Sequence, residues 1–381
     1  MNYYWQLSAF YLFYFGSLGA LVPYWGLYLH TLGFDANAIG ELMAIILVTK
    51  IIAPNIWGWI ADYTGKHILL VRLSSILAVI FFAGILIDQS YTWLVIILFL
   101  FSFFWNAALP QFEAITFNLL GKQPHQYGII RMWGSVGFII IVILFGWLFQ
   151  YVSITLLPIL LIGLFACIWL TSLLIPEQAT TNLSISTESF YQIITRPTVI
   201  ALFISCFLMQ FSHGPYYTFY SIYLEDNGYS RHVIGSLWAL GVVAEIGVFL
   251  VIQQLFTRFA INNLFVFSIA ITALRWLLIG YYIESMPIII FAQLLNAASF
   301  GLYHAVAMQI IRQNFSDQHQ GKAQALYGSV SFGAGGAIGS LISGYTWEIY
   351  GASVNYLCAT VICIIAVLVS WKWMREKNNE Y

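Results

Sequence analysis

Apolar runs of about 18 or more residues recur along the whole chain, and each is about as long as the ~20 residues with which a helix crosses a membrane. The 381 residues are 61% hydrophobic and 8% charged, whereas roughly a quarter of an ordinary soluble domain is charged. Such a chain cannot cover a water-facing surface. The run 139–149 lacks the alternation of a membrane β-strand, so helices must satisfy the backbone. The sequence therefore predicts an all-α polytopic membrane protein.

Twelve membrane spans are predicted, and one long polar stretch divides them six and six. This stretch, 176–197, is predicted to be a cytoplasmic linker between an N-terminal six-helix bundle, 1–175, and a C-terminal six-helix bundle, 198–381. The first apolar run has no basic leader or small-residue cleavage site, so we expect a true span there. The predicted spans are 6–29, 37–60, 67–87, 91–118, 127–149, 153–175, 198–224, 232–255, 262–283, 286–311, 321–345 and 349–373.

The basic residues near the ends of the spans predict the orientation. With the N-terminus inside, nine Lys and Arg residues fall on the inner side and one, Arg231, falls outside. Because cytoplasmic loops are enriched in Lys and Arg, both termini are predicted to be cytoplasmic, in the inner (cytoplasmic) membrane of a bacterium. The nine inner residues are Lys66, Lys122, Arg196, Arg258, Arg312, Lys322, Lys372, Arg375 and Lys377.

The two halves repeat each other in sequence. Tyr28-Leu29 and Ile39-Gly40 recur 195 positions later as Tyr223-Leu224 and Ile234-Gly235, which places Lys50 opposite Glu245. Parallel repeats around a central pathway are an architecture of secondary transporters, with the binding site near the bilayer midplane. The repeat predicts two pseudo-symmetric halves that share a scaffold and differ in charge.

Several other classes of function find little support in the sequence. No basic stripe or tail indicates nucleic acid, and the four cysteines lie in apolar runs without metal-ligand spacing. An enzyme would need a nucleophile with a base, and a membrane sensor would usually bring a soluble output domain. We therefore expect no catalytic residues, no metal and no cofactor beyond a proton gradient, with protons, a small molecule and lipid as partners of a monomer.

Charged residues within predicted spans are the main candidates for function, because such charges are costly and mark pathways or proton relays. Glu113 and Arg131 lie at matching depths on neighbouring spans and could pair, or could both sit at the headgroup level. Lys50 and Glu245 lie mid-span. Each could instead form a structural ion pair, and Arg275 is a candidate partner that keeps Glu245 ionised.

Span ten carries a polar stripe that fits a water-filled cavity. At 100° per residue its side chains share one broad sector, although hydrogen bonding between helices would explain each alone. For His304, as for His213, a direct role and a structural one are both open. The stripe comprises Gln293, Asn296, Ser299, Tyr303 and His304. The glycines of span eleven, such as Gly335 and Gly339 at GxxxG spacing, predict close helix packing.

The loop between spans two and three carries a specific motif. It contains Gly58, Asp62, Gly65 and Lys66 and resembles the loop motif of the major facilitator superfamily. The resemblance implies that fold, and a tight cytoplasmic turn whose aspartate holds an inner gate through a salt bridge and the helix end. The sequence departs from the motif at Tyr63, where a basic residue often stands, and at Thr257, which replaces the second acidic copy.

Within the superfamily, the first half resembles the lactose-permease group of proton symporters. The likeness rests on Phe13-Tyr14-Phe15, on Asn106-Ala107 with Pro110 and Glu113, and on Arg131-Met132 with Gly134. It implies substrate contacts for Glu113, Arg131 and Glu245 and a place near the proton site for Arg275. The group's essential histidine and proton-carrying glutamate correspond in this chain to Asn296 and Ser299, a departure from lactose-type chemistry.

A closer resemblance, over nearly the whole chain, is to the bacterial 3-phenylpropionate permease type. It is most specific from Tyr229 to Glu245 and includes Arg275-Trp276. It implies proton-coupled uptake of an aromatic carboxylate. We expect substrate contacts from Lys50, Glu113, Arg131, Trp133, Tyr24, Tyr217 and Asn296, and proton coupling by Glu245, Arg275 and His304. A sugar or nucleoside symporter is the alternative, and a drug exporter a further one.

Overall fold

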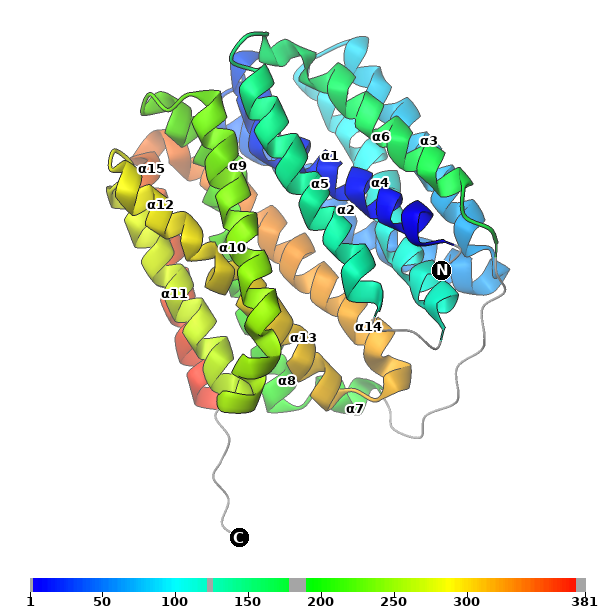
Figure 1. Cartoon of the computed structure of the whole chain (residues 1–381). Helices are drawn as coiled ribbons and strands as arrows, with labels where there is room; N and C mark the ends of the chain where they lie inside the picture. The colour runs from blue at the N-terminus through cyan, green and yellow to red at the C-terminus, as the bar shows by residue number, and fades with distance from the viewer. Residues whose placement is uncertain (1–2, 122–125, 178–189, 375–381) are drawn as a thin grey trace. The chain divides into compact units, whose positions relative to one another are not determined.

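A computed structural model describes residues 3–121, 126–177 and 190–374, and every regular element in these ranges is a helix (Figure 1). The helices of the first half are α1 (Tyr4–Thr31), α2 (Ala36–Thr64), α3 (His67–Ala83), η1 (Gly84–Leu86), α4 (Tyr91–Leu120), α5 (Tyr127–Leu148), η3 (Ile154–Leu156) and α6 (Leu157–Leu173). Those that follow are α7 (Phe190–Ile194), α8 (Pro197–Ser212), α9 (Gly214–Asp226), α10 (Arg231–Arg258), α11 (Ile261–Tyr281), α12 (Met286–Leu294), η4 (Ala297–Leu302), α13 (Tyr303–Asn314), α14 (Asp317–Tyr327), η5 (Gly328–Gly335) and α15 (Gly336–Met374).

Eleven stretches of helix in the described residues are long and apolar enough to cross a membrane. The last runs over 57 residues, Gln318–Met374, and is interrupted at Gly351, whose φ of 78° and ψ of 170° are not helical. A left-handed φ of this kind suits glycine. The break divides the stretch into two spans. The chain is thus a multi-pass membrane protein, and the predicted all-α polytopic fold is confirmed.

Two compact units make up the chain. The first comprises Met1–Asn182 and Tyr217–Ala239, and the second comprises Leu183–Tyr216 and Leu240–Tyr381. The predicted bundles, 1–175 and 198–381, stay a prediction. Residues 217–239, which hold most of α9 and the start of α10, belong to the first unit. Most of the predicted linker, 176–197, lies outside the described residues.

In the first unit, α1 packs closely along α5. A Cβ on Gly19 would lie 2.7 Å from the carbonyl oxygen of Phe138, so only glycine allows the two backbones to approach this far. Small residues are the usual means of close packing between helices in a membrane. A stacked pair of rings, Phe10 and Phe112, joins α1 to α4 with centroids 3.6 Å apart.

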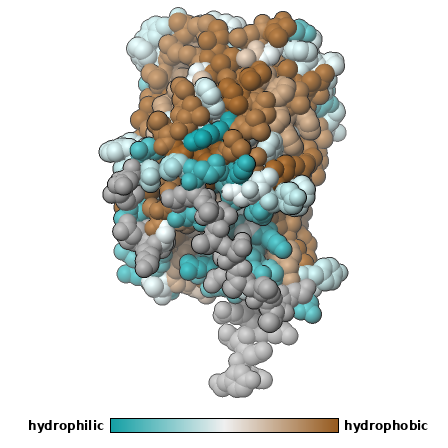
Figure 2. All heavy atoms as spheres, turned by 90° about the vertical axis from the view of Figure 1, so that its right-hand side faces the viewer, coloured by the Kyte–Doolittle hydropathy of each residue, from teal (hydrophilic) through white to brown (hydrophobic). Residues whose placement is uncertain are grey.

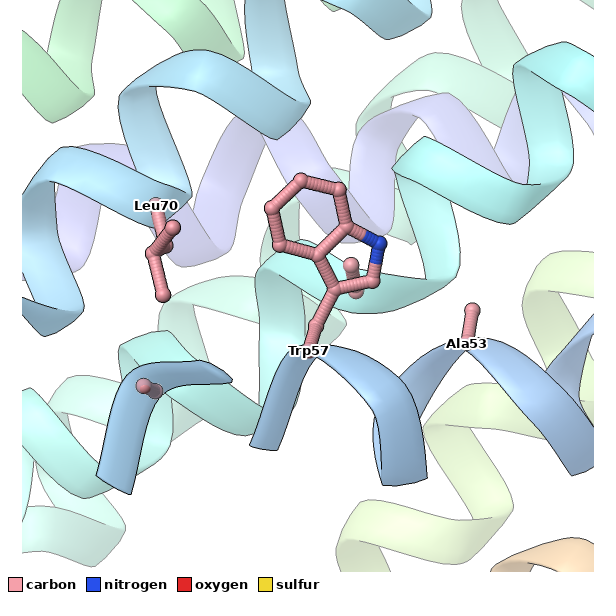
Figure 3. Close-up of a cluster of buried hydrophobic side chains, with 5 residues drawn as sticks. Ala53, Trp57 and Leu70 are labelled. Carbon is pink, nitrogen blue, oxygen red and sulfur yellow. The ribbon is translucent and has the colours of Figure 1, made fainter. Parts of the chain in front are cut away.

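A second contact of the first unit joins α2, α3 and α4 around Trp57 (Figure 3). The indole lies between Ala53 and Leu70, and Ala107 completes the cluster from α4. The three alanines of the cluster, Ala53, Ala61 and Ala107, leave room for this one large ring. The cluster packs against the C-terminal half of α2, where the predicted gate motif begins.

In the second unit, α8 packs against η5 and the start of α15. A Cβ on Gly335 would lie 2.5 Å from the Phe207 carbonyl oxygen, and one on Gly339 would meet the backbone of Phe211. The predicted close packing by these two glycines is confirmed. The segment η5 is a π-helix, as is η4, and such wide turns are frequent at functional sites.

The outer surface of the chain is strongly apolar. Hydrophobic side chains dominate the upper part of the face shown in Figure 2, and hydrophilic ones gather in its lower half. Leu250 is 79% exposed and Ile87 78% exposed, although both lie in or beside hydrophobic helices. Exposed side chains of this kind are stable in lipid rather than in water.

Candidate functional site

The second unit holds a buried polar network centred on Arg275. This arginine on α11 has no exposed surface, and its neighbours on span ten are Gln293, Asn296 and Ser299. Its Nη1 donates to Asn296 Oδ1 at 2.5 Å and to Ser299 Oγ at 2.8 Å, and its Nη2 donates to Gln293 Oε1 at 3.2 Å. A buried guanidinium is costly unless it is hydrogen-bonded. All three of these acceptors are neutral oxygens.

Aromatic rings cover the faces of the same guanidinium. The Arg275 Cζ lies 4.3 Å from the ring centroid of Tyr216 and 5.0 Å from that of Trp276. The Tyr216 hydroxyl also donates to Gln293 Oε1 at 3.1 Å. Cation–π contacts gain strength when they are removed from water. The arginine is therefore held in place both at its edge and on its faces.

Glu245 joins this network through Asn296. The Asn296 Nδ2 donates a hydrogen bond to Glu245 Oε1, while Oδ1 of the same amide accepts from Arg275. Within the described residues, no direct ion pair links Arg275 to Glu245. Arg275 and Glu245 thus belong to one network in which a neutral amide lies between them, and the role of Arg275 in keeping Glu245 ionised stays a prediction.

Two glycines allow α10 to approach span ten at this point. A Cβ on Gly241 would lie 3.1 Å from Asn296 Nδ2, and one on Gly301 would lie 3.4 Å from the Glu245 Cα. Gly241 and Glu245 are four residues apart and so share a face of α10. Asn296 and Gly301 are five residues apart, the spacing of a π-helical turn. The sequence thus brings the carboxylate and the amide together by removing side chains on both helices.

The first unit holds a second group of charges on α1, α4 and α5. Arg131 lies over the ring of Phe15, with its Cζ 3.6 Å from the centroid, and 5.7 Å from that of Tyr11. Glu113 accepts a hydrogen bond from the Tyr127 hydroxyl at 3.2 Å and lies close enough to Arg131 for the two charges to interact. No ion pair joins Glu113 to Arg131 in the described part of the chain. The pairing of Glu113 with Arg131 therefore stays a prediction.

Lys50 stands apart from that group. It is half-buried on α2, and no described residue forms a hydrogen bond or ion pair with it. Its neighbour Thr49 instead joins α2 to α4 by donating to Ser102 Oγ at 2.9 Å. A lysine that is partly buried without a counter-charge is a candidate for binding an anion.

The predicted aromatic contacts occupy different places. Trp133 donates to the Tyr4 hydroxyl at 2.9 Å, near the start of α1. Tyr24 is fully buried and donates to the Val142 carbonyl at 2.7 Å. Tyr217 stacks near Trp238, with centroids 6.4 Å apart. In this conformation Trp133 and Tyr24 therefore serve helix packing, and their roles in binding stay predictions.

His304 lies one turn beyond the buried network, at the start of α13. Its Nδ1 is 3.1 Å from the hydroxyl of Tyr327, and its ring lies parallel to that of Phe300 with centroids 6.2 Å apart. The ring centroid of Phe300 is 6.1 Å from that of Phe332 in η5. His304 therefore links the two π-helical spans. None of these contacts involves Arg275, so the part of His304 in proton coupling remains a prediction.

The loop after α2 forms the predicted tight turn. Gly65 adopts a left-handed conformation with φ of 67° and donates its N–H to the Ala61 carbonyl at 2.8 Å, a typical glycine cap. Asp62 is exposed and forms no ion pair with any described residue. The salt bridge implied for Asp62 is thus absent from this conformation, and its gating role, like that of Gly58 and Lys66, stays a prediction.

Some contacts were not expected from the sequence. Phe15 and Tyr127 position Arg131 and Glu113, and neither carries a charge that would mark it. Gln111 lies near Gly58, and its Oε1 is 2.9 Å from His67 Nδ1. This side chain joins the motif loop to α4. Such neutral partners resemble ordinary core residues in sequence.

Comparison with known protein families places the chain among transporters. Residues 4–358 match the model described as "MFS_1 like family". The "Probable 3-phenylpropionic acid transporter" of Escherichia coli (strain K12) is 27% identical over 93% of this chain and 94% of its own length. The "Maltose permease" of Geobacillus stearothermophilus is 26% identical over 94% of this chain and 92% of its own length.

Comparison with solved structures supports the fold. The crystal structure of the nucleoside transporter NupG matches with a TM-score of 0.84 and 18% identity, over 99% of this chain and all of that chain. At this identity the likeness concerns architecture alone. The fold of the chain is thus similar to that of a solved membrane transporter.

Proposed function

The chain belongs to the MFS_1 like family of membrane transporters, and we propose that it takes up a small organic solute together with protons. The solute class that we favour is an aromatic carboxylate such as 3-phenylpropionate. Transport would proceed by alternating access in the cytoplasmic membrane of a bacterium, with both termini inside. We propose a monomer that needs no cofactor besides the proton gradient.

The observation that carries proton coupling is the link from Glu245 through Asn296 to the buried Arg275. Removing an ion from water costs several kcal/mol even in a real protein. A carboxylate and a guanidinium are nevertheless retained in a membrane segment, which favours a functional role. Glu245 would carry the coupling proton, and Arg275 would compensate its charge whenever that proton leaves.

Recognition of the carboxylate would fall to the first unit. Arg131 presents its guanidinium across the ring of Phe15, and Lys50 has no counter-charge among the described residues. Either cation could receive an anionic group, and aromatic side chains on the same helices could stack on the solute. In this proposal the N-terminal half mainly binds the solute and the C-terminal half mainly handles the proton.

A second candidate is a symporter for a sugar or a nucleoside. The observation that favours it is the density of amide, hydroxyl and carboxylate groups beside Tyr216 and Trp276, since hydroxyl-rich solutes need many hydrogen-bond partners. The maltose permease is a relative at 26% identity. A drug exporter is a third candidate, without an observation of its own.

Uptake into proteoliposomes tests the proposal. An acid-outside pH gradient should drive accumulation of labelled 3-phenylpropionate, with maltose and uridine as parallel solutes. Accumulation of a sugar or nucleoside alone would select the second candidate. If the gradient drives accumulation of none of the three, proton symport of these solute classes is wrong.

A further inference from the structure

In the polar network of the second unit, the side-chain amide of Asn296 binds a positive group through its oxygen and a carboxylate through its nitrogen. We propose that Asn296 is a positioning residue that transmits the protonation state of Glu245 to Arg275. It does so because its side chain both donates and accepts hydrogen bonds. This inference rests on the proposed function, since it assigns to Asn296 the coupling role within the same site rather than a contact with the solute.

The hydrogen-bonding groups determine the orientation of the amide. A guanidinium can only donate, and an ionised carboxylate can only accept. Asn296 therefore turns Oδ1 toward Arg275 Nη1, at 2.5 Å, and Nδ2 toward Glu245 Oε1. The reverse orientation would place donor against donor and acceptor against acceptor. The amide thus acts as a polar bridge with one permitted direction.

The surroundings hold this bridge in place. Asn296 is 7% exposed and Arg275 is fully buried, so water does not readily replace either hydrogen bond. The close approach of α10 at Gly241 leaves little space on the other side of Nδ2. The Ser299 hydroxyl lies 3.4 Å from Asn296 Oδ1 and also accepts from Arg275. A rigid amide is therefore able to transmit a change at one end to the other.

Protonation gives the bridge its function. When Glu245 gains a proton, the carboxyl becomes neutral and its attraction for Nδ2 weakens, because hydrogen bonds to ionised groups are roughly twice as strong as neutral ones. The hydrogen bond at Nδ2 then restrains the amide less, while Arg275 still fixes its direction. The hydrogen bond from Arg275 to Asn296 Oδ1 therefore changes when Glu245 is protonated. Arg275 never exchanges a proton with Glu245. The amide itself carries no proton at any step.

Four substitutions at one position separate this bridge from a structural role. A neutral histidine has one donor and one acceptor nitrogen, so Asn296→His should retain accumulation within about twofold of wild type. Asn296→Asp offers acceptors only, and Asn296→Leu offers neither. Both should lower steady-state accumulation at least about tenfold, the effect of 1.4 kcal/mol on an equilibrium. Asn296→Gln keeps both a donor and an acceptor on a longer side chain, so its accumulation should lie between those of Asn296→His and Asn296→Leu.

A matched control removes another Arg275 partner without touching Glu245. Ser299 accepts from Arg275, and among the described residues no hydrogen bond joins it to the carboxylate. Ser299→Ala should therefore lower accumulation clearly less than Asn296→Leu. Solute counterflow, which needs no net proton movement, should persist in Asn296→Asp and Asn296→Leu. This persistence would show that both variants are folded and bind solute.

The outcomes distinguish the bridge from the function on which it rests. If wild-type accumulation follows the proton gradient but the His, Asp and Leu variants behave alike, the bridge is wrong and symport stands. If the wild type ignores the proton gradient, proton symport is wrong. If Asn296→Leu abolishes counterflow as well as accumulation while Asn296→His does not, Asn296 contacts the solute and the positioning role is overturned.

Discussion

Arg131 lies over the ring of Phe15, with its guanidinium carbon 3.6 Å from the ring centroid. Arginine is suited to this place because its planar group can stack on a ring and still present several donors at its edge. The stacking leaves those edge donors able to receive a carboxylate. The relationship therefore bears directly on how an anionic solute would be recognised.

Replacement of Arg131 by lysine should weaken binding while leaving the fold intact. Lysine keeps the charge but loses the planar contact with Phe15 and any two-pronged hydrogen bond. We expect the KM for a carboxylate solute to rise by roughly fivefold to tenfold, the effect of about 1–1.4 kcal/mol. Initial uptake rates over a range of solute concentrations measure this change.

Phe15→Tyr is the matched control for Arg131→Lys, because it keeps an aromatic face under the guanidinium. Its KM should stay near that of the wild type, while Phe15→Leu should resemble Arg131→Lys. An unchanged KM in Arg131→Lys would place the arginine at the headgroup interface rather than in the site.

Gly19→Ala should destabilise the first unit. The added Cβ would lie 2.7 Å from the Phe138 carbonyl oxygen and push α1 away from α5. Overpacking of this kind costs about 1–3 kcal/mol, so the unfolding midpoint in detergent should fall by several degrees. Gly163→Ala is the control, because its Cβ meets nothing within 4 Å and alanine favours a helix. Equal midpoints for the two variants would contradict the close contact.

Gly65→Ala should disturb the turn that ends α2. The φ of 67° at Gly65 is one that an L-residue adopts at a cost of roughly 1–2 kcal/mol. We expect lower thermal stability and slower uptake, since the turn orients Asp62. In Gly163→Ala, outside the motif, the new Cβ would meet nothing within 4 Å, and both quantities should change little. If both variants lose uptake equally, the left-handed turn does not explain the effect.

The sequence allowed the membrane fold to be predicted because lipid imposes a simple rule on long helices. Length and apolar content mark each span, and the glycine pair Gly335 and Gly339 marks close packing without reference to the rest of the chain. The boundary between the last two spans was predicted at 346–348, whereas the structure places the break at Gly351, which has a left-handed φ.

The candidate site was predictable in its charges and not in its connections. Glu245 and Arg275 are recognisable because a charge in an apolar run is rare. The amide between them is not, since Asn296 has no charge and periodicity gives only the face on which it lies. Similarly, Tyr127 binds Glu113 through a hydroxyl that sequence cannot distinguish from an interfacial tyrosine. Contacts across helices depend on helix rotation, which the π-helical turn of η4 alters.

Proton movement linked to the solute is the most direct test of the central claim. In proteoliposomes that contain a pH-sensitive dye, addition of 3-phenylpropionate outside should acidify the lumen with wild-type protein. Two controls are needed. A protonophore should abolish the acidification, and protein-free vesicles measure permeation of the free acid through the lipid. Glu245→Gln should lose this acidification and uphill uptake, because an amide cannot release a proton, yet retain counterflow. Acidification by Glu245→Gln equal to that of the wild type would contradict the role of Glu245 as the coupling residue.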